Sequence, residues 1–227
     1  MQRQKEAVPA MTRPTLVPAA GTVHGELVRR TLRERLASAL PERPRRTLDA
    51  HLRTVAEQGA GPLDDLFPAV EIRFGRTPLP GWAGWSVTDG VRTRLLAALP
   101  LTGTALAEEA RRRYESGAAG ERRSVLLALP FLPLGDTATD LVEDAVRSRS
   151  PRLLAAALGP YAGRHLNQDS WRQAVLNCLA TGVPLARVDR LADRRDLELA
   201  VLVQDFAAGC RAAHRSVPDD LWLAVGG

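Results

Sequence analysis

A chain of 227 residues is long enough for one domain with a substantial core, and its 45% hydrophobic and 25% charged residues are ordinary for a globular protein. Its 31 basic residues include a single lysine, Lys5, and leave a net charge of only +5, so long-range attraction to phosphate should be modest. No apolar run approaches the roughly 20 residues that span a bilayer, and no signal-peptide pattern begins the chain. Cys178 and Cys210 lie in apolar segments, which predicts reduced thiols. Together these features predict a cytoplasmic protein.

Residues 1–21 are polar and then rich in proline, without periodicity. This composition predicts a disordered leader, followed by one helical domain over residues 22–227. Apolar residues then recur every four positions, at Val28, Leu32, Leu36 and Leu40. The spacing predicts a first helix from about residue 22, and further helices are expected to open at Pro44 and Pro62.

The longest irregular stretch runs from Gly75 to Val87 and holds Trp82 and Trp85, half of the four tryptophans. Long loops often carry function, and two indoles can line a pocket or stack on a base. The alternative is that both rings fold back over helix faces. We expect one ring to be buried and the other partly exposed, which makes this loop the first candidate for contact with a ligand or partner.

Three similar stretches organise the middle of the chain at a spacing of about thirty residues. Each is an arginine-led apolar helix that stops at a proline: residues 92–100, 121–130 and 152–160. Chance similarity in a chain rich in alanine, leucine and arginine is one explanation. A fixed period is also typical of stacked helical hairpins, because one unit cannot bury its own apolar face. We therefore predict an all-α single domain of stacked antiparallel hairpins, HEAT-like or α-solenoid in type, with Pro100, Pro130 and Pro160 each ending a helix.

The C-terminal part is also expected to be helical. A last long helix, from about Asp193 to His214, is apolar on nearly every face, which predicts that it runs through the core. Pro218 should then begin a short terminal turn that docks through Leu221 and Trp222.

Familiar catalytic signatures are absent: the sequence has no phosphate-binding glycine-rich loop with lysine, no HExxH, no Cys-x-x-Cys and no Gly-x-Ser-x-Gly. The four histidines are far apart, so no catalytic residue, metal ligand or cofactor is predicted. Arg164, His165 and Arg172 surround a loop–helix junction that could hold an anion at a helix N-terminus, with a solvated turn as the alternative. Arg122 belongs to a candidate basic edge beside residues 111–113, with a solvated face as the alternative.

Several stretches taken together resemble the EboA family. They are residues 121–123 with their Leu-Pro stop, and residues 159–166 (Gly-Pro-Tyr-Ala-Gly-Arg-His-Leu), 171–176, 182–185, 205–207 and 217–222. The likeness extends from about Thr22 to Trp222, and Tyr161 in the second stretch joins the candidate binding residues. The resemblance implies a helical bacterial protein encoded beside a UbiA-like prenyltransferase and homologues of sugar-phosphate or metal-dependent enzymes. That gene cluster is tied to making or exporting secondary metabolites.

We therefore predict a non-catalytic binding or scaffold protein that assists the biosynthesis or export of a secondary metabolite. Its expected partners are other proteins of that cluster or a small metabolite. The alternatives are an enzyme with a small-molecule site near the tryptophan loop, or a HEAT-like nucleic-acid-binding protein with a basic concave stripe around an aromatic and an acidic residue. Nucleic-acid binding should be weak, because the arginines are spread along the chain and balanced by 26 acidic residues. The candidate binding residues are Trp82, Trp85, Arg122, Tyr161, Arg164, His165 and Arg172.

Overall fold

Thirteen α-helices and two short 3₁₀ helices make up the part of the chain that the computed structural model describes, residues 22–148 and 150–226. These residues form no strand beyond an isolated bridge between Pro78 and Ser86. The prediction of an all-α domain is confirmed. The predicted leader, residues 1–21, lies outside the described residues.

Apolar spacing and helix-stopping residues set most of the helix boundaries. In α1 the predicted stripe through Leu32 and Leu36 is buried, and Pro41 follows the helix. The next helix begins at Glu42 rather than at the predicted Pro44. The helices are α1 (Thr22–Ala39), α2 (Glu42–Gln58), α3 (Leu63–Phe74), α4 (Val87–Ala97), α5 (Gly103–Ser116), α6 (Ala119–Ala128), η1 (Leu129–Phe131), α7 (Thr139–Arg147), α8 (Pro151–Ala157), α9 (Pro160–His165), α10 (Gln168–Thr181), η2 (Leu185–Arg187), α11 (Leu191–Arg194), α12 (Leu197–Ala212) and α13 (Trp222–Val225).

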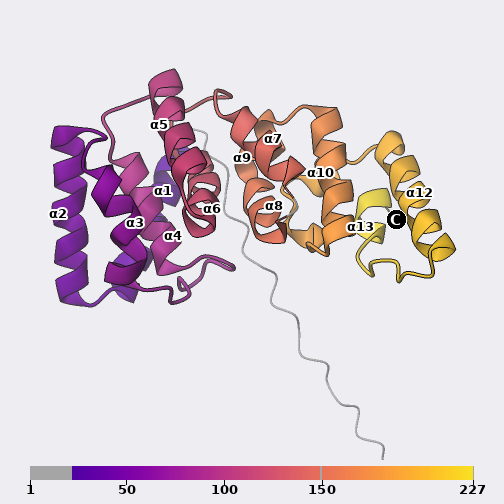
Figure 1. Cartoon of the computed structure of the whole chain (residues 1–227), viewed down its shortest axis with the longest axis horizontal. Helices are drawn as coiled ribbons and strands as arrows, with labels where there is room; N and C mark the ends of the chain where they lie inside the picture. The colour runs from indigo at the N-terminus through magenta and orange to yellow at the C-terminus, as the bar shows by residue number, and fades with distance from the viewer. Residues whose placement is uncertain (1–21, 149, 227) are drawn as a thin grey trace, which may run out of the picture.

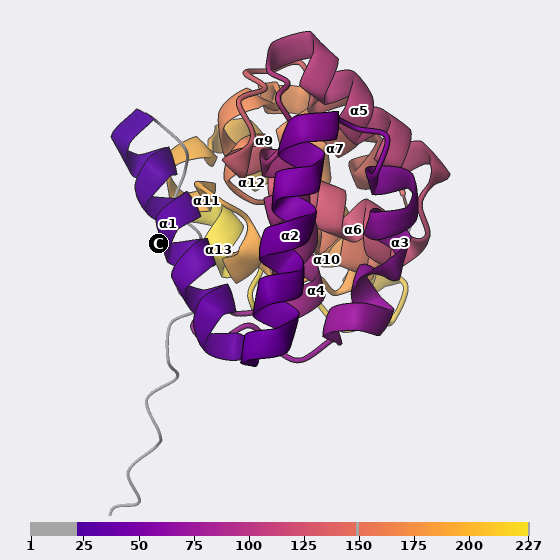
Figure 2. The ribbon, with the colours of Figure 1, turned by 90° about the vertical axis from the view of Figure 1, so that its left-hand side faces the viewer.

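Helices α4, α6 and α8, which contain the three similar stretches, lie side by side. Helix α4 packs against α6, and α6 packs against α8 (Figure 1). At one end of this row α1, α2 and α3 pack on α4, and Figure 2 shows this end facing the viewer. At the other end α10 packs on α8, and α12 packs on α10. The chain thus progresses along the length of an elongated molecule.

The three prolines of the similar stretches all lie beyond the end of a helix, as predicted. Pro100 comes shortly after Ala97, the last residue of α4. Pro130 lies in the 3₁₀ helix that directly continues α6, and Pro160 is the first residue of α9, just after α8 has ended. These positions suit a residue that has no N–H to donate. Gly159 before Pro160 is extended, as proline favours, whereas Leu129 before Pro130 keeps helical geometry. Pro68, in contrast, lies inside α3.

Both tryptophans of the loop before α4 are buried, with exposed fractions of 8% for Trp82 and 6% for Trp85. The expectation that one ring would be partly exposed was therefore wrong. The two rings meet edge to face at 4.8 Å between centroids, and each lies 5.6 Å from the ring of Phe131. Hydrogen bonds from the Leu79 N–H to the Trp85 carbonyl and from the Val87 N–H to the Thr77 carbonyl fold the loop inward. The aromatic cluster then removes both rings from water.

The expectation that the last long helix runs through the core was also wrong. Helix α12 lies at the C-terminal end of the row (Figure 1), where α10 covers only part of it. One face is buried at Leu199 and Val203, while Leu197 and Val201 on other faces are exposed. Trp222 is likewise 62% exposed, so the terminal helix α13 does not dock through this ring as predicted. A helix with a neighbour on one side leaves even apolar positions in water.

Candidate functional site

A groove of about 910 Å³ runs along the row formed by α4, α6 and α8. Its lining comes from these three helices, from residues 83–86 of the tryptophan loop, from the segment 182–189 after α10, and from Tyr161 at the start of α9. Volumes of roughly 300–1,000 Å³ are typical of small-molecule sites. This groove is therefore the candidate functional site.

Much of the lining is apolar. Helix α6 contributes Leu126 and Leu127, and helix α8 contributes Leu153 and the alanines 155–157. Because an alanine side chain ends at Cβ, the middle of α8 leaves open space above it. Trp85 adds an aromatic edge from the loop before α4. An apolar ligand that covers this lining would gain about 25 cal/mol of favourable free energy for each Å² of apolar surface removed from water.

Asp89 is the most strongly engaged carboxylate of the lining. It is the third residue of α4, and it forms a reciprocal capping box with Ser86, whose side chain accepts a hydrogen bond from the Asp89 N–H. Its Oδ1 accepts a 2.9 Å hydrogen bond from the Ser124 hydroxyl, and its Oδ2 lies 2.5 Å from a guanidinium nitrogen of Arg123. Because Asp89 is almost fully buried and has these partners on α6, it fixes α4 against α6.

Arg92 is the buried cation of the same helix. Its Nε donates to the carbonyl of Phe67 at 3.0 Å, and its guanidinium lies over the Phe67 ring and 3.5 Å from a Glu121 oxygen. Burial lowers the pKa of Arg92, while Glu121 and Asp89 oppose that shift. Arg92 therefore ties α4 to α3 and α6.

Two other arginines meet at Gly84 in the tryptophan loop. Arg123 of α6 donates from Nη2 to the Gly84 carbonyl. From the far side of the groove, Arg187 of η2 reaches the same glycine, because a Cβ on Gly84 would lie only 2.8 Å from its Nη1. Gly84 also has a φ of +78°, a conformation that residues with a Cβ rarely adopt. The loop thus brings guanidinium groups from α6 and η2 to one place.

Tyr161 and Asp189 line another part of the groove. The Tyr161 hydroxyl accepts a 3.0 Å hydrogen bond from the Ala138 N–H, and burial raises its pKa. Oδ2 of Asp189 packs against Gly163 so closely that a Cβ there would lie 2.3 Å away. This oxygen is buried and has no hydrogen-bond partner among the described residues, and burial raises the pKa of Asp189.

The structure does not bring the seven predicted site residues together. Trp85 and Tyr161 line the groove, and Trp82 packs behind Trp85. Arg164 and His165 are the last residues of α9, outside the lining, where the His165 ring lies 4.7 Å from that of Tyr161. Burial lowers the pKa of His165, and Arg164 lowers it further.

Arg122 points away from the groove. Its guanidinium stacks over the ring of Tyr114 at 4.5 Å and lies 3.6 Å from a carboxylate oxygen of Asp144. The next residue, Arg123, is the one that lines the groove. One position along a helix turns a side chain by about 100°, which is why the two neighbours face different parts of the fold.

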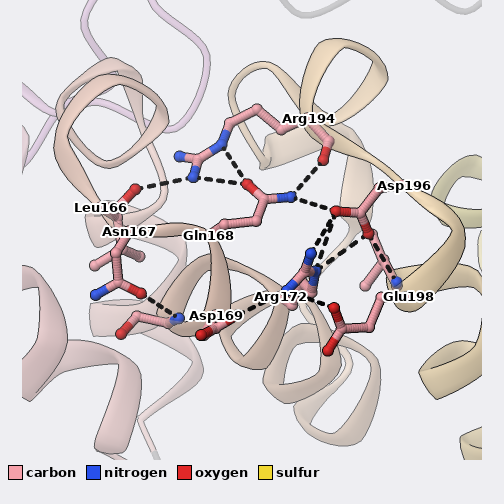
Figure 3. Close-up of polar contacts among 10 residues, drawn as sticks. Leu166, Asn167, Gln168, Asp169, Arg172, Arg194, Asp196 and Glu198 are labelled. Atoms are coloured by element: carbon pink, nitrogen blue, oxygen red, sulfur yellow. Dashed lines mark hydrogen bonds and ion pairs between the residues drawn. The ribbon is translucent and has the colours of Figure 1, made fainter.

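Arg172 is engaged in a separate polar network at the start of α10 (Figure 3). Its guanidinium lies 2.6 Å from both Asp169 and Asp196 and 2.9 Å from Glu198. Gln168 donates to the same Asp196 carboxylate at 2.9 Å, which joins α10 to the N-terminus of α12. An external anion would have to displace one of three carboxylates to reach Arg172. The network is suited to holding the two helices together.

The candidate residues predicted from the sequence did not include Asp89, Arg92, Arg123, Arg152 and Arg187, which all line the groove. For three arginines a signal was present: the head of each of the three similar stretches places one arginine in the lining, namely Arg92, Arg123 and Arg152. Arg187 has no such signal, because it lies in an irregular segment and reaches the groove only through the tertiary fold.

Within residues 22–148 and 150–226, no group of three or more histidine, cysteine or acidic side chains is placed to hold a metal ion. No helix in the same ranges combines the length and the apolar character needed to cross a bilayer.

The fold and the groove define an all-α protein with a ligand-sized groove along a row of helices. A family model described as the metabolite traffic protein EboA matches residues 50–226, and the chain belongs to this family. The resemblance found in the sequence is thereby confirmed. No curated protein and no solved structure matches the chain.

Proposed function

We propose that this EboA-family protein binds a small metabolite in the groove without transforming it, and thereby assists the biosynthesis or export of a secondary metabolite. The observation that carries the proposal is the groove itself, with a volume of about 910 Å³ and leucine and alanine side chains along α6 and α8. The family description, a metabolite traffic protein, agrees with a role in carrying or presenting a small molecule.

We also propose that the row of helices is a short stack of hairpins of the α-solenoid type. Support comes from the side-by-side packing of α4, α6 and α8, which are the helices of the thirty-residue period. Stacked hairpins present extended surfaces on which partners bind. In this proposal other proteins encoded in the same cluster contact the helical stack, while the metabolite occupies the groove.

An enzyme acting on a small molecule is the second candidate, and one observation favours it. Asp189 is a groove carboxyl whose pKa is raised by burial, and such groups are common at catalytic sites. The nucleic-acid alternative has less support. That alternative requires an aromatic and an acidic residue at the centre of a basic concave stripe. In the groove these residues would be Trp85 and Asp89, and both are buried.

The experiment is to fill the groove and look for bound metabolite. Ala155 is a half-buried lining residue of α8, so Ala155→Trp would occupy the open space above this helix. Ala208→Trp, at an exposed position of α12, is the matched control. Native mass spectrometry of protein purified from its host should show a small-molecule adduct on the wild type and on the control, and not on Ala155→Trp. An unchanged adduct on Ala155→Trp would show that the groove is not the binding site.

A further inference from the structure

We propose that the groove selects an amphipathic organic anion, with the anionic head at Arg187 and Arg152 and the apolar body along α6 and α8. This inference rests on the proposed function, because it names the chemical class of the metabolite that the same groove binds.

The charge of the lining favours an anionic ligand. Five arginines stand against three carboxylates: Arg76, Arg92, Arg123, Arg152 and Arg187 against Glu71, Asp89 and Asp189. Three of the arginines are already compensated by carboxylates. Arg76 lies 2.6 Å from Glu71, Arg123 lies 2.5 Å from Asp89, and Arg92 lies 3.5 Å from Glu121. Glu121 is not part of the lining, and the two lining arginines that have no carboxylate partner among the described residues are Arg152 and Arg187.

Arg152 and Arg187 are the two uncompensated cations. Neither has a carboxylate within 4 Å or a side-chain hydrogen bond to another of the described residues, and both are exposed. Asp189, the third carboxylate of the lining, is electrostatically coupled to Arg190 and Arg164 instead. Two guanidinium groups that face a groove without partners are suited to an anion that arrives from solution, since a guanidinium can bind two oxygens of a carboxylate or phosphate at once.

The position of Arg187 also favours a bound anion. Its guanidinium lies against Gly84, the residue to whose carbonyl Arg123 donates. Two guanidinium groups thus approach each other from different walls of the groove, while Asp89 pairs with only one of them. Like charges at close range are unfavourable, and an anion bound at Arg187 would relieve that repulsion. The arrangement of the two guanidinium groups at Gly84 therefore favours a bound anion.

The rest of the lining suits a ligand with an apolar body. Leu126, Leu127 and Leu153 line the groove together with the alanines of α8. A bare inorganic anion would leave this surface in water, and a polyanion such as nucleic acid would also meet the carboxylates of Glu71 and Asp189. A molecule with one anionic end and an apolar remainder satisfies both parts of the lining.

The test uses a matched pair of fluorescent probes, 11-(dansylamino)undecanoate and its uncharged methyl ester, titrated into the full-length protein. The acid should bind about tenfold or more tightly than the ester at low salt, as expected for charge-assisted hydrogen bonds. The double variant Arg152→Gln/Arg187→Gln should lose this preference and keep the affinity for the ester. Arg53→Gln, at an exposed arginine of α2 outside the groove, is the control and should behave as the wild type.

The outcomes of these titrations distinguish a failure of the inference from a failure of the proposed function. Equal affinity for acid and ester would overturn the inference and leave the proposed function standing, whereas binding of neither probe would overturn both. A preference for the acid that survives in the double variant would place the head elsewhere and overturn the inference.

Sedimentation with phosphatidylglycerol vesicles separates a free molecule from a membrane as the source of the anion. Probe binding without co-sedimentation is expected, and binding to vesicles alone would overturn the inference. Circular dichroism confirms that each variant is folded.

Discussion

Gly84 and Arg187 touch across the groove, since a Cβ on Gly84 would lie 2.8 Å from Nη1 of Arg187. The contact joins the loop before α4 to the segment after α10, two parts of the chain that are far apart in sequence. Such a contact requires a residue without a side chain on one partner and a long, flexible side chain on the other. It also couples the shape of the tryptophan loop to the position of a groove cation.

Gly84→Ala tests this contact. The positive φ of +78° should make the alanine cost about 1–2 kcal/mol of stability, as for other residues forced into left-handed backbone geometry. Gly59→Ala is the control, because Gly59 has a φ of +76° and nothing within 4 Å of its Cβ position. Thermal melts should show similar losses for both variants. Only Gly84→Ala should also weaken binding of 11-(dansylamino)undecanoate, since only there must an arginine move. Equal binding by the two variants would contradict the role of the contact.

The aromatic cluster around Phe131 is expected to be a major source of stability. Trp82→Ala and Trp85→Ala should each cost about 3–5 kcal/mol, as for large aromatic truncations in cores. The double variant should cost less than the sum of the two, because the rings contact each other at 4.8 Å and share Phe131. Urea denaturation followed by circular dichroism measures these losses. The exposed Trp222 provides the control, Trp222→Ala, which should change stability by no more than about 0.5 kcal/mol.

Asp89→Ala should be among the most damaging single changes in the groove. It removes the capping box of α4 and leaves Arg123 without its carboxylate. Breaking a buried ion pair in this way costs about 3–5 kcal/mol. Asp140→Ala breaks the more exposed pair with Arg111 and should cost at most about 1 kcal/mol. If the two variants had the same unfolding free energy, Asp89 would not hold α4 to α6 as described.

Sequence patterns identified the helices far better than they identified the site. Every-fourth-residue spacing predicted α1, and the thirty-residue period predicted that the helices of the three stretches are neighbours, because both signals arise from burial along one helix face. The sequence pointed to Arg122, whereas Arg123 is the one that lines the groove, because a helix position alone does not reveal which neighbour packs on it. Leu197 and Val201 were expected inside because composition cannot show that α12 is the last helix of the row.

The network around Arg172 makes a specific prediction for acid stability. Hydrogen bonds from Arg172 hold the pKa of Asp196 well below its usual range, and the Leu199 N–H and Gln168 add to the shift. A carboxyl with a lowered folded-state pKa contributes stability above its unfolded pKa of about 4, and this contribution is lost as the pH falls toward the folded-state value. Asp196→Asn should therefore be less stable than the wild type at pH 7, and the difference should shrink at pH 2.5.

Urea denaturation at pH 7, 4 and 2.5 measures this convergence. Asp205→Asn is the control, because Asp205 is exposed on the same helix α12 and has no ion pair among the described residues. It should follow the wild type at all three values. A constant difference between Asp196→Asn and the wild type across this range would show that Asp196 does not supply the acid dependence.

The two cysteines are expected to be inert in the folded protein. Cys178 in α10 and Cys210 in α12 are both buried and free, and burial raises the pKa of Cys178 to about 12, with Asp220 adding to the shift. The thiolate is the reactive form, so a thiol of this pKa in a buried position has neither the charge nor the access that a thiol reagent needs.

At pH 8, native protein should therefore release almost no chromophore from 5,5′-dithiobis(2-nitrobenzoate), while both thiols react at once in guanidinium chloride. Ser216→Cys, at an exposed position after α12, should add one fast equivalent and calibrate the assay. A fast equivalent in the unmodified chain would mean that α10 or α12 opens on the time scale of the reaction, and that the helices joined by Arg172 and Asp196 are held less firmly than their contacts indicate.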